Sequence, residues 1–371
     1  MVKKRFLILS MVLMACIEPA EFDVPPAESL IIIEGMISDQ EGPYTVKINR
    51  ALPLLTEELD YPVVTGASIR LHDDQGNIED FEEVSPGVYQ TGGAMRGVVG
   101  RSYHITVNTA DGEQFESVPE QIKPVGQVTD IRFEYERERE DDFFGEVNKD
   151  YFNVYVDATE GPNAENYVRW RMTGTYKIET QPQLREVLVH PGAVPLKDPR
   201  PCSGYTTAPN PFGRGTIIVK IGDCTCCVCY VNDFEKSPTI SDNLLASNGA
   251  FSQVKVGTVS INSATFYEKY MVTVEQMSMS RIAFDFQNLI RIQKEEASNI
   301  FQPASGELIG NIKSENSSDR VIGLFWATSI TEKVDFIERS DVPYPIPPFP
   351  GAEESCLLEF ENSTITKPEA W

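Results

Sequence analysis

Apolar residues recur at every second position along much of the chain between residues 30 and 120. This is the period of a β-strand with one buried face. Turn sequences such as Asp73–Asn77 separate the periodic runs, and short strands divided in this way predict an immunoglobulin-like β-sandwich. The clearest alternating runs are Tyr44–Ile48, Pro62–Leu71 and Gly100–Val107, and the continuously apolar run Leu30–Ile33 predicts a buried strand.

One later segment, Arg281–Ala297, has the period of a helix instead. Ser278 or Ser280 precedes it as a candidate N-cap. We expect its apolar face to pack against the sheet of a second domain, under the strand Val321–Trp326. The face is formed by Ile282, Phe286 and Leu289.

Other strand-like and irregular segments complete the second half. The charge run Glu134–Asp142 predicts a solvated strand end or a loop within a boundary at Lys123–Asp150. Thr180–Arg214 is rich in proline and glycine, so we expect a long irregular excursion. The remaining strand-like runs are Tyr151–Val156, Tyr167–Ile178, Phe266–Gln276 and Val321–Ala327.

The N-terminus has the layout of a secretory signal peptide. The basic residues Lys3–Arg5 precede the apolar run Phe6–Met14, which is shorter than the roughly 20 apolar residues of a transmembrane helix. The segment Leu13–Cys16 resembles the bacterial lipobox, and this resemblance implies cleavage before Cys16 and lipidation of that residue. The alternative is an ordinary signal peptide with an incidental cysteine. The polar, proline-rich residues 16–29 then predict a flexible tether.

The composition indicates a globular protein, and its net charge excludes one class of binding partner. The 371 residues are 41% hydrophobic and 10% aromatic, as in a globular protein, and the formal net charge is −24. Loss of the signal peptide makes the mature chain more negative still. A field of this sign repels nucleic acid, so we expect no nucleic-acid partner.

Cysteine usage agrees with export. Besides Cys16 the chain has an even number of cysteines, which in an oxidising compartment predicts disulfides with about 15 possible full pairings. We expect bridges within the cluster, one to Cys202 and one to Cys356. A thiolate metal site or a redox motif is the alternative, but zinc-ribbon spacing is missing. The disulfide candidates are Cys202, Cys224, Cys226, Cys227, Cys229 and Cys356.

Catalytic and ligand-binding motifs are scarce. The three histidines, His72, His104 and His190, have no companion at metal-ligand spacing, and no Gly-x-Ser-x-Gly elbow supplies a nucleophile. Asp73–Asn77 has some features of a calcium loop but lacks the closing glutamate, which favours a plain hairpin. We therefore expect no cofactor, no metal and no catalytic residue.

Short motifs follow one another along nearly the whole mature chain: Ile33–Ile37, Gly42–Val46, Val64–Ala67, Gly87–Tyr89, Gly100–Tyr103, Ser280–Phe286, Gly310–Ile312 and Gly323–Phe325. In their order and spacing they resemble the Bacteroidota lipoproteins of domain of unknown function 4249. That resemblance implies an outer-membrane lipoprotein that accompanies a SusC-like TonB-dependent transporter. The cluster Cys224–Cys229 is denser than the family pattern, so no disulfide pairing is carried over.

These observations predict a mostly β protein with an immunoglobulin-like or carboxypeptidase-regulatory-like sandwich and a second β-rich domain carrying one main helix. The expected segments are a signal peptide (1–15), a tether (16–29), the sandwich (30–122), the second domain with helix 281–297 (123–345) and a C-terminal tail (346–371).

The expected function is non-catalytic: an accessory or ligand-capturing lipoprotein of a TonB-dependent uptake system. The expected partners are the β-barrel transporter and, through the lipid, the outer membrane, on its periplasmic or its cell-surface face. An exported hydrolase acting on the same nutrients and a purely structural envelope protein are the alternatives.

Overall fold

The computed structural model is mostly β, as the sequence pattern predicts. It describes residues 30–51, 62–142, 145–162, 165–184, 199–212, 216–241, 246–296, 308, 310–316, 320–352 and 355–371. No helix within these ranges is both long and apolar enough to cross a membrane.

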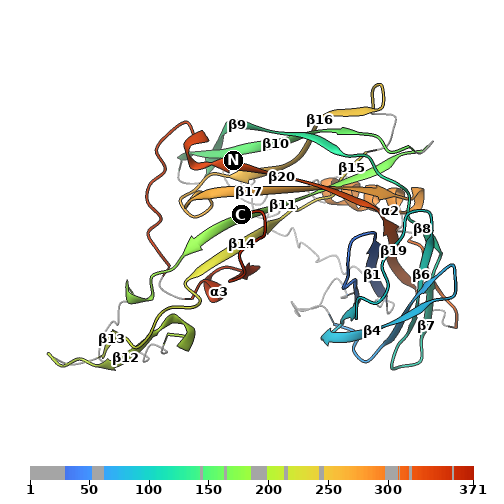
Figure 1. The fold of residues 1–371 in the computed structure, drawn as a ribbon, viewed down its shortest axis with the longest axis horizontal. Coiled ribbons are helices and arrows are strands. Elements are labelled where there is room, and N and C mark those ends of the chain that lie inside the picture. The colour runs from blue at the N-terminus through green and yellow to red at the C-terminus, as the bar shows by residue number, and fades with distance from the viewer. Residues whose placement is uncertain are drawn as a thin grey trace, which may run out of the picture.

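One curled sheet with its core, here called the N-lobe, lies at the lower right of Figure 1. Its strands are β1 (Ile31–Ser38), β2 (Thr45–Arg50), β3 (Ser68–Asp73), β4 (Ile78–Ser85), β5 (Val88–Thr91), β6 (Ser102–Asn108), β7 (Gln114–Ser117), β8 (Glu120–Gln121), β18 (Ile312–Ser314) and β19 (Val321–Thr328). The hydrogen-bonded order is β18-β7-β6-β3-β4-β5-β2-β1-β19, with β8 beside β6. The periodic runs of the sequence supply its core, which includes Ile33, Ile48, Ile69 and Ile105.

Strands β18 and β19 come from the predicted second domain but are hydrogen-bonded to strands of the predicted first. β19 runs parallel to β1, from Ile31 opposite Val321 to Ser38 opposite Thr328. Two glycines allow the close approach of the backbones here. A Cβ on Gly310 would lie 1.5 Å from the Gly323 carbonyl oxygen, and one on Gly323 would lie 2.0 Å from the Ile33 carbonyl oxygen. Both ends of the curled sheet therefore meet at Gly310.

Two stacked sheets, here called the C-lobe, lie above the N-lobe in Figure 1. The first has the order β16-β10-β9 and consists of β9 (Val128–Asp142), β10 (Gly145–Thr159) and β16 (Ala250–Ser260). The second has the order β20-β17-β11-β14-β21, with β15 beside β11. Its strands are β11 (Tyr167–Glu179), β14 (Val228–Phe234), β15 (Thr239–Ser241), β17 (Lys269–Met279), β20 (Ile330–Glu338) and β21 (Ser363–Thr364). The buried Trp170 packs edge-on against Phe251 between the layers, with ring centroids 5.0 Å apart.

The charge run at residues 134–142 is a strand end, which was one of the two predicted alternatives. It belongs to the long hairpin of β9 and β10, whose register begins with Gly145 opposite Asp142. The side chains of residues 134–139 are exposed, so this charged strand end is solvated.

Helix α2 (Arg281–Glu296) joins the two lobes. The Ser280 hydroxyl accepts the Ala283 N–H at 3.1 Å, so Ser280 is the N-cap. Ala283 and Phe286 are buried in one cluster with Leu324 and Trp326 of β19 and Met277 of β17, which confirms the predicted contact with Val321–Trp326. The predicted face is right for Phe286 only: Ile282 is 41% exposed, and Ala283 and Ile290, rather than Ile282 and Leu289, join the cluster.

A disulfide-rich segment, here called the arm, projects at the lower left of Figure 1. It contains η2 (Pro201–Ser203) and the hairpin of β12 (Tyr205–Pro209) and β13 (Thr216–Lys220). The helix α3 (Cys356–Glu359) packs beside β14 at the base of the arm, and the single turn η1 (Pro182–Leu184) contacts β13. The single turn η4 (Arg339–Asp341) follows β20. The predicted irregular excursion at Thr180–Arg214 thus includes a strand, because β12 finds its partner after residue 215.

Candidate functional site

All six cysteines of the described residues form disulfides, which confirms the predicted disulfides. The bridges are Cys202–Cys226, Cys224–Cys227 and Cys229–Cys356, with Cα atoms 5.6, 5.7 and 6.0 Å apart. Cys229 and Cys356 are fully buried beside Ile178 and Val231. Cys202–Cys226 therefore joins the arm to the residues just before β14, and Cys229–Cys356 joins the C-terminal segment to β14. Cys224–Cys227 closes a short loop between them. These are structural roles. The lipidation candidate Cys16 lies outside the described residues.

Two of the three histidines are neighbours on the N-lobe surface, which the sequence spacing does not indicate. His72 and His104 are cross-strand partners whose rings stack at 4.7 Å. His72 Nε2 lies 2.9 Å from Thr106 Oγ1, and His104 Nε2 lies 3.5 Å from Glu116 Oε1. Burial and the neighbouring His104 lower the pKa of His72, which favours its neutral form. His190 lies outside the described residues.

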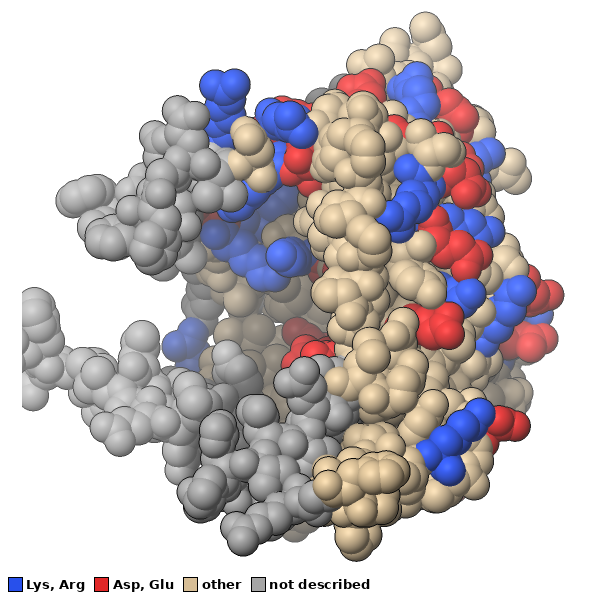
Figure 2. All heavy atoms as spheres, turned by 90° about the vertical axis from the view of Figure 1, so that its left-hand side faces the viewer, with Lys and Arg blue, Asp and Glu red and all other residues tan. Residues whose placement is uncertain are grey.

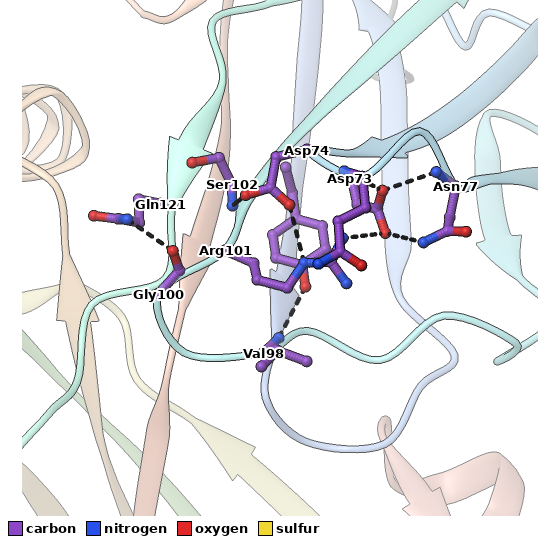
Figure 3. Close-up of polar contacts among 10 residues, drawn as sticks. Asp73, Asp74, Asn77, Val98, Gly100, Arg101, Ser102 and Gln121 are labelled. Atoms are coloured by element: carbon purple, nitrogen blue, oxygen red, sulfur yellow. Dashed lines mark hydrogen bonds and ion pairs between the residues drawn. The ribbon is translucent and has the colours of Figure 1, made fainter.

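The turn at Asp73–Asn77 is a hairpin turn, as the sequence predicts in preference to a calcium loop. Asp73 accepts the N–H groups of Gln75 and Asn77 at 2.9 and 2.8 Å, and Arg101 bridges Asp73 and Asp74 at 2.6 and 2.9 Å (Figure 3). Burial alone would raise the pKa of Asp73, but the hydrogen bonds from Asn77, Gln75 and Arg101 lower it to about 2. The guanidinium of Arg101 thus occupies the position beside the Asp73 and Asp74 carboxylates that a bound cation would take. Across the described part of the chain, no group of three or more His, Cys, Asp or Glu residues is arranged to hold a metal ion.

The strongest candidate for a binding site is a groove of ≈ 510 Å³ at the junction of the two lobes. The N-lobe contributes β1, β2 and β19 to its lining, the C-lobe contributes β11, and helix α2 lies between them. The segment 235–238, which connects β14 to β15, forms the remaining side. Pockets of this volume are typical of small-molecule sites, and sites between domains are common.

The charge of this groove is opposite to that of the chain. Acidic residues outnumber basic ones by 56 to 32 over the whole sequence. Among the described residues that line the groove, the acidic ones are Glu34 and Glu235, whereas the basic ones are Lys47, Arg169, Arg171, Lys236 and Lys294. Figure 2 shows Lys and Arg side chains gathered deep in a hollow of the face turned to the viewer. A cleft of one sign concentrates ligands of the opposite sign.

Strand alternation places two of these cations. Val168 and Trp170 are buried in the core of the C-lobe, so Arg169 and Arg171 project from the other face of β11. Arg171 forms a bidentate pair with Glu275 of the adjacent strand, at 2.5 and 2.9 Å. Burial alone would lower the pKa of Arg171, but the hydrogen bonds and charge of Glu275 raise it. Arg171 is therefore held rigidly and remains charged.

Arg169 forms an ion pair with Glu235, which lies in the segment 235–238. The pair uses one carboxylate oxygen. Arg169 Nε and Glu235 Oε2 are buried and have no hydrogen-bond partner among the described residues. An arginine and a carboxylate bind most strongly through two parallel hydrogen bonds, so this pair falls short of its best geometry.

The lysines of the groove differ in whether their ammonium groups are bound to other groups of the protein. Lys294 Nζ donates to the Lys236 carbonyl oxygen at 2.9 Å. Lys47 and Lys236 have exposed side chains, and neither forms an ion pair with another described residue. An incoming anion can be bound by these two ammonium groups without breaking an ion pair between described residues.

A second hollow, of ≈ 650 Å³, lies on the other side of the segment 235–238, along β16. Its basic residues Lys236, Lys255 and Arg291 are matched by the acidic residues Asp233, Glu235 and Glu295. Because the basic and acidic residues are equal in number, this hollow favours neither anions nor cations. The groove of ≈ 510 Å³ is therefore the better candidate for an anion site.

Sequence reasoning did not identify the groove residues. The alternation of Arg169 and Arg171 with Val168, Trp170 and Met172 is the one local signal, because it places two cations on one face of a strand. Lys47 and Lys294 join them only through the fold. The described residues of the lining include no histidine and no cysteine.

Comparisons with known proteins give one informative result. A family model described as "Domain of unknown function (DUF4249)" matches residues 17–334. No curated protein matches the chain. Among solved structures, trypsin-activated alpha-2-macroglobulin from Escherichia coli is 11% identical, with a TM-score of 0.17. That match covers 71% of this chain but only 15% of the alpha-2-macroglobulin chain, and it carries no argument about function.

Proposed function

The chain belongs to the DUF4249 family, and we propose that it is an outer-membrane lipoprotein that captures a ligand for a TonB-dependent, SusC-like transporter. In this proposal the protein is non-catalytic, and a Bacteroidota envelope is its setting. The observation that carries the proposed capture role is the groove between the lobes, because its lining comes from both lobes and from helix α2.

The anchor is supported by the sequence. Lys3–Arg5, the apolar run Phe6–Met14 and the segment Leu13–Cys16 follow each other in the order of a lipoprotein signal. The three disulfides support export, since disulfides persist in oxidising compartments such as the periplasm and the cell surface. A lipid on Cys16 would then place the fold at the membrane, with residues 16–29 as its tether.

An immunoglobulin-like or carboxypeptidase-regulatory-like sandwich is our proposed description of the N-lobe. Its support is the curled antiparallel arrangement of β2–β7 around one core. The parallel pair of β1 and β19 is an addition to that pattern.

The anchor is tested by mass spectrometry of the mature N-terminus. A diacylglyceryl-modified and N-acylated Cys16 is the expected result, and Cys16→Ala should accumulate as an uncleaved precursor. A mature chain that begins at another residue, without lipid, would refute the proposed localisation.

The hydrolase alternative is separated by incubating the purified protein with the ligand that it captures. We expect the ligand to be recovered unchanged after many hours. Recovery of a cleaved product, lost on substitution of a groove residue, would favour an enzyme.

A further inference from the structure

We propose that the groove between the lobes binds a small molecule carrying at least two anionic oxygen groups, carboxylates or phosphates. The inference rests on the proposed capture function and names the chemical class of the captured ligand. Of the described residues that line the groove, five are basic and two are acidic, in a chain whose acidic residues are in large excess.

The arrangement of the cations indicates more than one anionic group. Lys47 lies on β2 of the N-lobe, whereas Arg169 and Arg171 lie on β11 of the C-lobe. Lys236 lies on the segment between β14 and β15. A ligand with a single charge can satisfy one of these sides only, whereas a ligand with two or more charges joins the two lobes.

Glu235 gives the groove a built-in competitor. Its carboxylate occupies Arg169, but through one oxygen, with Arg169 Nε and Glu235 Oε2 both buried and unpaired among the described residues. A buried polar group without a partner destabilises the arrangement that contains it. A ligand carboxylate or phosphate that engages Arg169 would therefore displace Glu235 at a low cost. The segment 235–238 would move with it.

The apolar part of the lining limits the ligand. Met36, Phe286 and Ile290 line the groove beside the charged residues. Phe286 is almost fully buried and fixed by the cluster that joins the lobes. A volume of ≈ 510 Å³ admits a compact small molecule. Citrate and inorganic pyrophosphate are suitable probes, and sucrose is an uncharged probe.

The test is isothermal titration calorimetry on the mature, lipidated full-length protein in neutral detergent, at low and at high salt. We expect citrate, pyrophosphate or both to bind and sucrose not to bind, with weaker binding at high salt because ions screen the charges. Binding of citrate alone would identify carboxylates as the ligand groups, and binding of pyrophosphate alone would identify phosphates. Failure of both anions to bind at millimolar concentration, or equal binding of sucrose, would overturn the inference.

Two sets of variants are expected to change the Kd of the bound anion in opposite directions. The double variant Lys47→Gln, Lys236→Gln should raise the Kd of the bound anion roughly tenfold or more, because each lost charge-assisted contact has a free energy near the 1.4 kcal/mol of a tenfold change. Glu235→Gln should lower the Kd severalfold, because it removes the competing carboxylate. A melting curve of each variant establishes that it is folded.

The matched control is Lys313→Gln, Lys367→Gln, which removes the same two charges from exposed positions that do not line the groove. This control should leave the Kd within twofold of the parent. An equal loss in both double variants would show that only the net charge matters, and the groove would then not be the site. Co-purification of a transporter with a protein that binds no anion would leave the capture role intact and reject only this ligand class.

Discussion

Replacement of Phe286 by alanine should destabilise the whole protein, because this ring joins the two lobes. Phe286 is 4% exposed and shares a cluster with Leu324 and Trp326 of the N-lobe and Met277 of the C-lobe. Loss of a buried phenylalanine ring leaves a cavity and typically lowers the free energy of unfolding by about 3–5 kcal/mol. We expect a decrease within this range.

Urea unfolding followed by tryptophan fluorescence measures the effect. Ile282→Ala is the matched control, since Ile282 lies on the same helix but is 41% exposed, and surface substitutions of this kind change stability by roughly 0.5 kcal/mol or less. The apolar pattern alone places both residues on one buried face and predicts similar losses of stability. The structure predicts a large loss for Phe286→Ala only, so the two variants distinguish the two predictions. Equal effects of the two variants, or a Phe286→Ala curve that overlays the parent curve, would refute the role of Phe286 in joining the lobes.

Three further predictions concern buried charges and a disulfide. Burial raises the pKa of Glu120 above its usual value, so its charged form destabilises the folded protein as the pH rises. Glu120→Gln should therefore raise the melting temperature at pH 8, and this gain should shrink towards pH 4. A gain that is the same at both pH values would contradict this prediction. The pKa of Asp73 is lowered from 3.8 to about 2, so its contribution is present above pH 4 and is lost as the pH falls through about 2. Asp73→Asn should cost about 2 kcal/mol at pH 7 and almost nothing near pH 2, and chemical unfolding at both pH values decides this. Substitution of both Cys229 and Cys356 by serine should cost roughly 2–5 kcal/mol in calorimetry, and an unchanged melting temperature would show that the bridge between residues 127 positions apart is dispensable.

Local periodicity predicts much of this fold. The alternation in Tyr44–Ile48 and Gly100–Val107 corresponds to β2 and β6, and the helical run corresponds to α2. β4 escapes prediction because half of its sequence, IEDFEEVS, is acidic, and its two buried residues are Glu79 and Phe81. Patterns of this kind report which face of an element is buried and not which element covers it.

Long-range pairing was beyond the sequence for the same reason. Nothing local in Val321–Thr328 indicates that it pairs in parallel with a strand about 290 residues earlier. The groove is a consequence of that pairing, because β19 brings Leu324 and Trp326 beside α2 and β11. The disulfides are the converse case, since oxidation and an even number of cysteines predict their presence although not their connectivity.

The central proposal is ligand capture beside a transporter, and isolation of the native complex tests it most directly. The affinity-tagged full-length chain is purified from detergent-solubilised outer membrane of its own host, and the proteins that accompany it are identified and quantified by mass spectrometry. We expect a TonB-dependent β-barrel transporter in near-stoichiometric amount, lost when Cys16→Ala keeps the chain from the membrane. Recovery of the lipidated chain from the outer membrane with no β-barrel protein above the level of an untagged control would contradict it.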